Sequence, residues 1–60
     1  MTKKDYVLIA KVIEAVGSNY CGDKVAQDVI IFTAERLAES FAGENIKFNS
    51  EKFLTACGVN

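Results

Sequence analysis

Residues 26–38 read AQDVIIFTAERLA, and they determine the fold class that the sequence predicts. The centre of this segment, Val29 to Thr33, is β-branched and aromatic and favours a strand when it is considered alone. The residues around it, however, are mostly good helix formers, among them Ala34, Leu37 and Ala38. A strand that is apolar on both faces would also need a sheet to bury it, and the remaining sequence provides none. The segment is therefore predicted to be helical.

Helix starts and stops divide the chain, which contains no proline, into three helical segments. Residues 2–5 resemble a capping box, and Asp23 and Asn49 are good N-caps for the two later segments. A glycine follows the apolar periodicity of each segment, where a left-handed residue commonly ends a helix: Gly17, Gly43 and Gly58. The predicted helices are residues 3–16, 24–42 and 50–57.

These elements predict a single all-α domain over residues 1–60. The first connection, residues 17–23, is short enough for an antiparallel helical hairpin. The second connection carries Ile46 and Phe48, which are expected to fold back over the open end of the hairpin. The third helix has only about two turns and must dock to be stable, so it is expected to close the hairpin.

The first helix is apolar around more of its circumference than one neighbouring helix can cover. Its main stripe has the i, i+3, i+4, i+7 spacing of a buried face and consists of Tyr6, Ile9, Ala10, Ile13 and Val16. Leu8, Val12 and Ala15 widen this stripe on one side, to an arc of roughly 200° where about 100° covers a single core. Part of this surface is therefore expected to need a further partner.

A similar surplus appears on the second helix. Val25, Val29, Phe32 and Arg36 form a heptad-like seam, and Phe32 projects among charged residues. Two interpretations remain open: the third helix or the residues Ile46 and Phe48 cover Phe32, or the seam meets another chain. The candidate interface residues from both helices are Leu8, Val12, Val25, Val29, Phe32 and Arg36.

The small size of the chain favours self-association. A domain of this length buries only about 60% of the surface of its unfolded chain, so disulfides, a metal or a second subunit usually add stability. Cys21 and Cys57 lack the spacing of a zinc site, and the sequence has no histidine and no secretory leader. The thiols are expected to stay reduced in a cytoplasm, with Cys57 packed in the core. A homo-oligomer is therefore expected.

The sequence shows no pattern typical of catalysis, cofactor binding or metal binding. A nucleophilic Ser or Cys usually needs a neighbouring base, most often histidine, and no glycine-rich phosphate loop is present. The net charge of −1 is mixed along the chain, without the basic patch that nucleic-acid binding requires. No apolar run approaches the ~20 residues of a membrane span. We expect a non-enzymatic, cytoplasmic protein without cofactor, metal or membrane partner.

The two ends of the chain resemble a group of small helical proteins encoded in bacteriophage and prophage genomes. The resemblance lies in TKKDY (2–6) and LIA (8–10), and in Asn45, FNSEKFL (48–54) and ACG (56–58). An acidic cap and arginines are commoner in that group than the Asn49, Ser50 and Lys52 found here. Because the group has no settled activity, the resemblance implies a context in a host cell and no mechanism.

Together, these observations predict a non-catalytic accessory protein of phage type that binds a host or phage protein and self-associates. Two other classes of function remain as alternatives. A nucleic-acid-binding regulator would use polar residues of the second or third helix, although these are interspersed with acids. A small-molecule-sequestering oligomer would bind an anionic ligand between its subunits through Tyr6, Tyr20 and lysine side chains.

Overall fold

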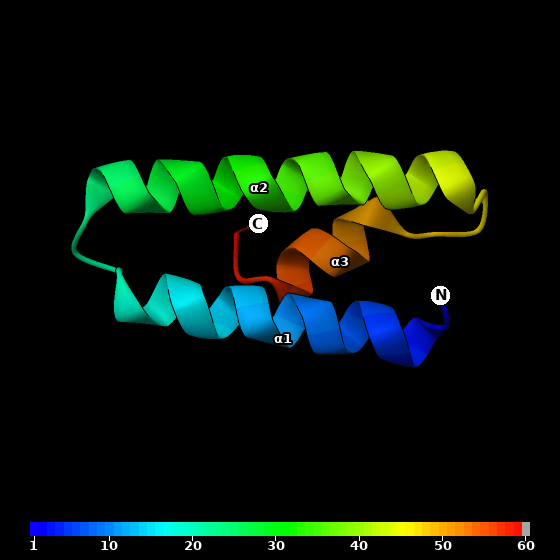
Figure 1. Cartoon of the computed structure of the whole chain (residues 1–60), viewed down its shortest axis with the longest axis horizontal. Helices are drawn as coiled ribbons and strands as arrows, with labels where there is room; N and C mark the ends of the chain where they lie inside the picture. The colour runs from blue at the N-terminus through cyan, green and yellow to red at the C-terminus, as the bar shows by residue number, and fades with distance from the viewer. Residues whose placement is uncertain (60) are drawn as a thin grey trace.

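The computed structural model describes residues 1–59 and confirms the predicted all-α architecture. Helix α1 spans Lys3–Asn19, α2 spans Lys24–Glu44 and α3 spans Ser50–Ala56, and no strand occurs in this part of the chain. The two long helices run antiparallel as a hairpin, and the short α3 packs against both (Figure 1). The Cα atoms extend over 35 × 18 × 14 Å, so the molecule is elongated.

The predicted helix starts are confirmed by their hydrogen bonds. The backbone N–H of Thr2 donates to the Asp5 carboxylate over 3.0 Å. The Asp23 carboxylate accepts a hydrogen bond from the N–H of Ala26, and the Asn49 side chain accepts one from the N–H of Lys52, both at 3.0 Å. Each cap satisfies a backbone donor that has no partner inside the helix, which fixes where the helix begins.

The glycine-based helix ends are right at Gly58 and wrong at Gly17 and Gly43. Gly58, with φ at 79°, is the sole positive-φ residue among residues 1–59. Its N–H donates to the Thr55 carbonyl and the N–H of Val59 donates to the Leu54 carbonyl, which is the Schellman pattern at the end of α3. Gly17 and Gly43 instead lie inside α1 and α2, so these helices run three and two residues further than predicted.

Gly17 continues α1 because α2 supplies partners for the last carbonyl groups of the helix. The Gln27 side-chain amide donates to the backbone carbonyls of both Gly17 and Tyr20, each over 2.9 Å. These bonds tie the start of α2 to the end of α1 across the hairpin turn. A side-chain contact of this kind cannot be inferred from the spacing of glycines.

Small side chains form most of the buried core. The five buried residues that the structure describes are Ala10, Ala34, Ala38, Phe53 and Cys57. The three alanines come from α1 and α2, whereas Phe53 and Cys57 come from α3, which packs on this alanine surface. Because these side chains of the hairpin are small, the third helix can approach it closely.

An aromatic cluster of Tyr6, Phe41, Phe48 and Phe53 closes one end of the hairpin. Ring centroids within it are 4.7–5.5 Å apart, in the tilted and edge-to-face arrangements that aromatic pairs prefer. Phe48 therefore folds back over the hairpin as predicted. The matching prediction for Ile46 is wrong, because this side chain is 98% exposed. The Asn45 side chain accepts a hydrogen bond from the N–H of Lys47, so the connection turns between the two hydrophobic residues.

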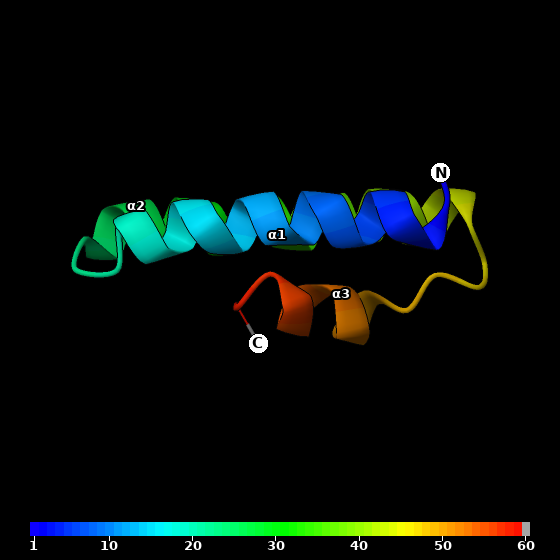
Figure 2. The ribbon, with the colours of Figure 1, turned by 90° about the horizontal axis from the view of Figure 1, so that it is seen from below.

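Helix α3 lies on one side of the plane that α1 and α2 define. In a view along that plane, α1 and α2 nearly superimpose while α3 occupies a separate layer (Figure 2). One broad face of the hairpin is therefore covered by α3 and the other is not. This asymmetry determines where the predicted interface residues are placed.

Candidate interaction surfaces

The predicted interface residues of α1 lie on the side away from α3. Tyr6 and Ala10 face α3, since Tyr6 contacts Phe48 and Ala10 belongs to the core with Phe53. Leu8 is two residues from each of them, and a two-residue step turns a helix by about 200°. Val12 lies one turn further along from Leu8, at i+4. Both side chains are more than half exposed, at 63% for Leu8 and 57% for Val12.

The predicted interface residues of α2 also lie on the side of the helix away from its buried face. Ala34 is completely buried, and Phe32, two residues before it, is 61% exposed. Val29 and Val25 precede Phe32 by about one and two helical turns and are 59% and 74% exposed. The Arg36 guanidinium lies 5.9 Å from the centroid of the Phe32 ring, within range of a cation–π contact, and 3.7 Å from the Glu39 carboxylate.

The structure answers the question of what covers Phe32 within the chain. Helix α3 packs on the opposite face of the hairpin, Phe48 belongs to the aromatic cluster, and Ile46 points into solvent. None of the three candidate covers reaches the Phe32 ring. The apolar surplus predicted from the sequence is therefore present on the surface of the single chain, while its use as an interface stays a prediction.

One further residue extends this surface. Val16 is 41% exposed although the sequence assigned it to the buried stripe of the first helix. Val16 lies at i+4 from Val12, so it continues the row that begins with Leu8. We refer to this uncovered apolar surface as the open face, and its members are Leu8, Val12, Val16, Val25, Val29 and Phe32.

Opposite charges flank the two sides of the open face. Lys4 and Lys11 stand at i−4 and i+3 from Leu8, so they border the α1 side. Asp28 and Glu35 stand at i−4 and i+3 from Phe32, and together with Glu39 they border the α2 side. All five side chains are exposed. The α1 edge is therefore basic, whereas the α2 edge is mostly acidic but also carries Arg36 beside Phe32.

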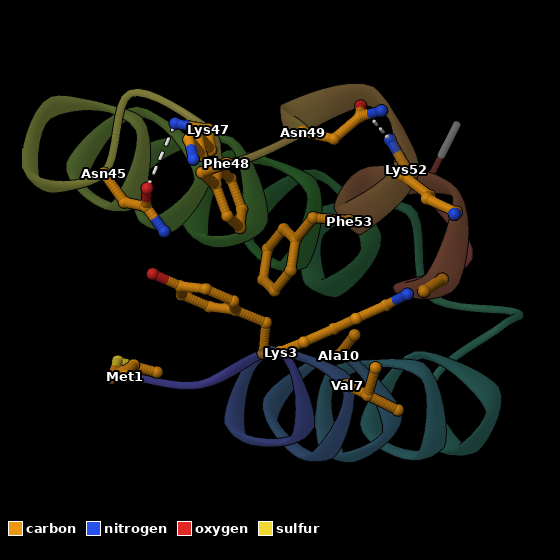
Figure 3. Close-up of a pocket in the computed structure, with 12 residues that line it drawn as sticks. Met1, Lys3, Val7, Ala10, Asn45, Lys47, Phe48, Asn49, Lys52 and Phe53 are labelled. Atoms are coloured by element: carbon orange, nitrogen blue, oxygen red, sulfur yellow. Dashed lines mark hydrogen bonds between the residues drawn. The ribbon is translucent and has the colours of Figure 1, made fainter.

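A groove lies on the α3 side of the molecule, bounded by α1, α3 and the connection between α2 and α3. Its volume is about 480 Å³, within the 300–1,000 Å³ range of small-molecule sites. We call it the lysine groove because Lys3, Lys47 and Lys52 line it (Figure 3). The sequence did not reveal it, because its walls come from three segments whose packing no local pattern encodes.

Both cysteines border a second, smaller cavity of about 210 Å³ between the hairpin turn and the C-terminal end of α3. Both are free thiols; Cys21 is exposed and Cys57 is buried. Burial raises the pKa of the Cys57 thiol, because its environment penalises the thiolate. Cys57 thus acts as a small apolar core residue, as its position on the apolar side of the third helix predicted.

Residues 1–59 hold no group of three or more His, Cys, Asp and Glu side chains arranged to bind a metal ion. None of the helices described here combines the length and the apolar composition that crossing a bilayer requires. In comparisons with known proteins, the chain matches no family model, no curated protein and no solved structure.

Proposed function

We propose that this chain is a non-catalytic protein-binding module that forms a homodimer through its open face. The observation that carries the proposal is the exposure of six apolar side chains in one surface, beside a core built mainly from alanines. Contiguous apolar patches larger than a few hundred Å² are rare on monomers and typically mark interaction sites. A second copy of the chain supplies the same surface and buries both at once.

The size of the face fits such a dimer. A stable interface buries about 800 Å² on each partner. The whole chain has an accessible surface of 4480 Å², so an interface of this size would use about a fifth of it. The broad side of the hairpin, on which the open face lies, extends over 35 × 18 Å. An interface of that size would therefore occupy essentially the whole of this broad side, and the opposite face remains for α3.

The charges at the two edges favour one arrangement of the copies. If the twofold axis runs parallel to the helices, α1 of one copy lies over α2 of the other, and basic edges meet acidic edges. Rotation about such an axis does not change the position of a residue along the helix direction, so residues at the same height in the two copies lie opposite each other. Within one chain, Tyr6 is level with Phe41 and Gly17 with Gln27, so Lys11 of one copy lies level with Glu35 of the second copy.

The same axis brings apolar residues into register. By the same pairing of levels, Val16 of one copy is level with Val29 of the other copy, and Val12 is level with Phe32 to within about two residues. The alternative axis, perpendicular to the helices, would place α1 over α1 and bring the two basic edges together. Like charges across an interface are unfavourable, so the parallel axis is the one that we propose.

The proposal is tested by sedimentation equilibrium of the protein and of two matched variants. The wild-type chain is expected to be dimeric at micromolar concentration. Phe32→Glu places a charge within the interface and is expected to raise the dimer dissociation constant at least tenfold, since burying an unpaired charge is strongly unfavourable. Ile46→Glu adds the same charge at an exposed position away from the open face and is expected to leave the dimer unchanged. A wild-type chain that stays monomeric at 100 µM or so contradicts the proposal.

We extend the proposal to a role as an accessory protein of phage type that binds a host or viral protein. This part is supported by the resemblance of the two chain ends and by the lack of any apparent catalytic arrangement in the sequence. Affinity capture from a bacterial lysate is expected to recover a partner in stoichiometric amounts with the wild-type protein. Recovery of nothing stoichiometric contradicts this role without bearing on the dimer.

A further inference from the structure

The charged side chains at the rim of the lysine groove are all cations, and its other polar side chains are Tyr6 and two asparagines. Lys3 of α1, Lys47 of the connection and Lys52 of α3 contribute three ammonium groups from three different segments. None of the lining residues that the structure describes is acidic. In a chain with a net charge of −1, this concentration of positive charge is local and is not a property of the whole surface.

Two asparagines add further donors to the same rim. The side-chain oxygen of Asn45 accepts from the N–H of Lys47, and that of Asn49 accepts from the N–H of Lys52, both over 3.0 Å (Figure 3). These bonds hold the two side-chain oxygens toward the backbone, and the amide NH₂ groups of both side chains make no hydrogen bond within residues 1–59, so they can donate to a ligand. The groove is therefore equipped to recognise a group that only accepts hydrogen bonds and carries negative charge.

The wall of the groove is apolar. It includes the rings of Tyr6, Phe48 and Phe53 and the side chains of Val7 and Ala10. Val7 is 44% exposed, as expected for a residue that lies among the charged residues of α1. Aromatic and aliphatic surface of this kind binds hydrocarbon, with a free energy that grows with the area removed from water.

From this combination we propose that the lysine groove binds a small anionic amphiphile, namely a medium-chain carboxylic acid. The alkyl chain lies against the aromatic wall and the carboxylate accepts hydrogen bonds from the lysine ammonium and asparagine amide groups at the rim. The site lies on the α3 side, opposite the open face, so it is independent of the proposed dimer. It is also complete within one chain, unlike a pocket between subunits.

The probe for this site is decanoate, used below its micelle concentration and followed by methyl chemical shifts in ¹H–¹³C spectra. We expect a dissociation constant on the order of 0.1 mM, which is what ligand efficiency allows for about twelve heavy atoms. Shift changes should concentrate at Val7, Ala10 and Ala56, which line the groove. Leu8, Val12 and Val29 on the open face should not shift. Shifts confined to the open face would overturn the proposal and would instead reflect its unspecific hydrophobicity.

Charge recognition is tested with matched ligands and matched variants. Decanol and decylammonium have the same chain length without the negative charge, and each should bind at least five- to tenfold more weakly than decanoate. The variant Lys47→Ala should weaken decanoate binding about three- to fivefold, whereas Lys24→Ala, with the same change in net charge outside both the groove and the open face, should not. Both lysines are exposed, so neither variant should unfold. Equal binding of decylammonium, equal effects of the two variants, or no binding at 5 mM or so would each overturn the proposal.

Discussion

The two broad faces of the hairpin use apolar residues in opposite ways. On the face covered by α3, the hairpin contributes the small side chains of Ala10, Ala34 and Ala38, which are almost completely buried. On the other face, it presents Leu8, Phe32 and four valines, which are between two fifths and three quarters exposed. A monomer that stood alone would be expected to place its larger apolar residues inside. The proposed dimer would remove this difference, because a second copy would cover the open face.

The covered face should depend most strongly on Phe53. This side chain is 5% exposed and joins α3 to the alanine surface and to the aromatic cluster. Phe53→Ala should destabilise the fold by about 3–5 kcal/mol, because it removes buried area and leaves a cavity. For a 60-residue domain this loss is comparable to the total stability. The measurement is urea denaturation followed by circular dichroism. A change below about 1 kcal/mol would mean that α3 does not form the core described here.

The cysteines provide a comparison between a covered and an uncovered position. Cys57 is buried among apolar groups. A serine hydroxyl at this position would lose its hydrogen bonds to water without gaining a hydrogen-bond partner in the protein. Cys57→Ser should therefore destabilise by about 1–3 kcal/mol. Cys21→Ser at the exposed hairpin turn should change stability by less than about 0.5 kcal/mol. Equal effects of the two substitutions in the same denaturation experiment would contradict the assignment of Cys57 to the core.

The affinity of the dimer should fall when one charge at the edge of the open face is reversed, and it should recover when the opposing charge is reversed as well. Lys11→Glu places an acid level with Glu35 of the second copy and should weaken the dimer by about 1 kcal/mol, or roughly fivefold, at low salt. Adding Glu35→Lys to the same chain should restore the affinity, because the pair is then reversed as a whole. Sedimentation of the single and double variants at two salt concentrations measures both effects. A double variant as weak as the sum of its two single variants would argue against the parallel twofold axis.

Two glycines in opposite environments should respond to alanine with opposite signs. Gly17 lies inside α1, and a Cβ there would be 4.0 Å from Ile30 Cγ2, an ordinary contact. Gly17→Ala should stabilise the protein by about 0.5–1 kcal/mol, since glycine is a poor helix former. Gly58 has a φ of 79°, and a Cβ there would be 3.4 Å from Glu14 Cγ. Gly58→Ala should destabilise by about 1–2 kcal/mol. Thermal unfolding of both variants checks the opposite signs.

The sequence predicted the parts of this fold that depend on local chemistry. Caps such as Asp23 and Asn49 fix helix starts through bonds to residues three positions away, so they can be read directly from the chain. Helix ends at Gly17 and Gly43 were misplaced because a glycine permits termination without requiring it. Gln27 binds the carbonyls at the end of α1 across the turn, and this contact has no local signature.

The two candidate surfaces also differ in whether a local sequence pattern reveals them. Five of the six residues of the open face were predicted, because each helix displays its surplus in its own periodicity, whereas Val16 was assigned to the buried stripe. The lysine groove was not predicted, because Lys3, Lys47 and Lys52 come together only when α3 docks. Ile46 and Phe48 show the limit within a single connection: they are two residues apart, yet one is in the aromatic cluster and the other is in solvent. The turn at Asn45 directs the two side chains to different sides of the connection.

The central claim, that a second copy covers the open face, is tested most directly by isotope-filtered nuclear Overhauser spectra on a mixture of labelled and unlabelled chains. A dimer of this kind should give intermolecular contacts between the Val16 methyl groups of one copy and the Val29 methyl groups of the other, and between the Val12 methyl groups and the Phe32 ring. Intermolecular contacts that involve only the groove side, such as Val7 and Ala56, would contradict it. So would a complete absence of intermolecular contacts at millimolar protein concentration.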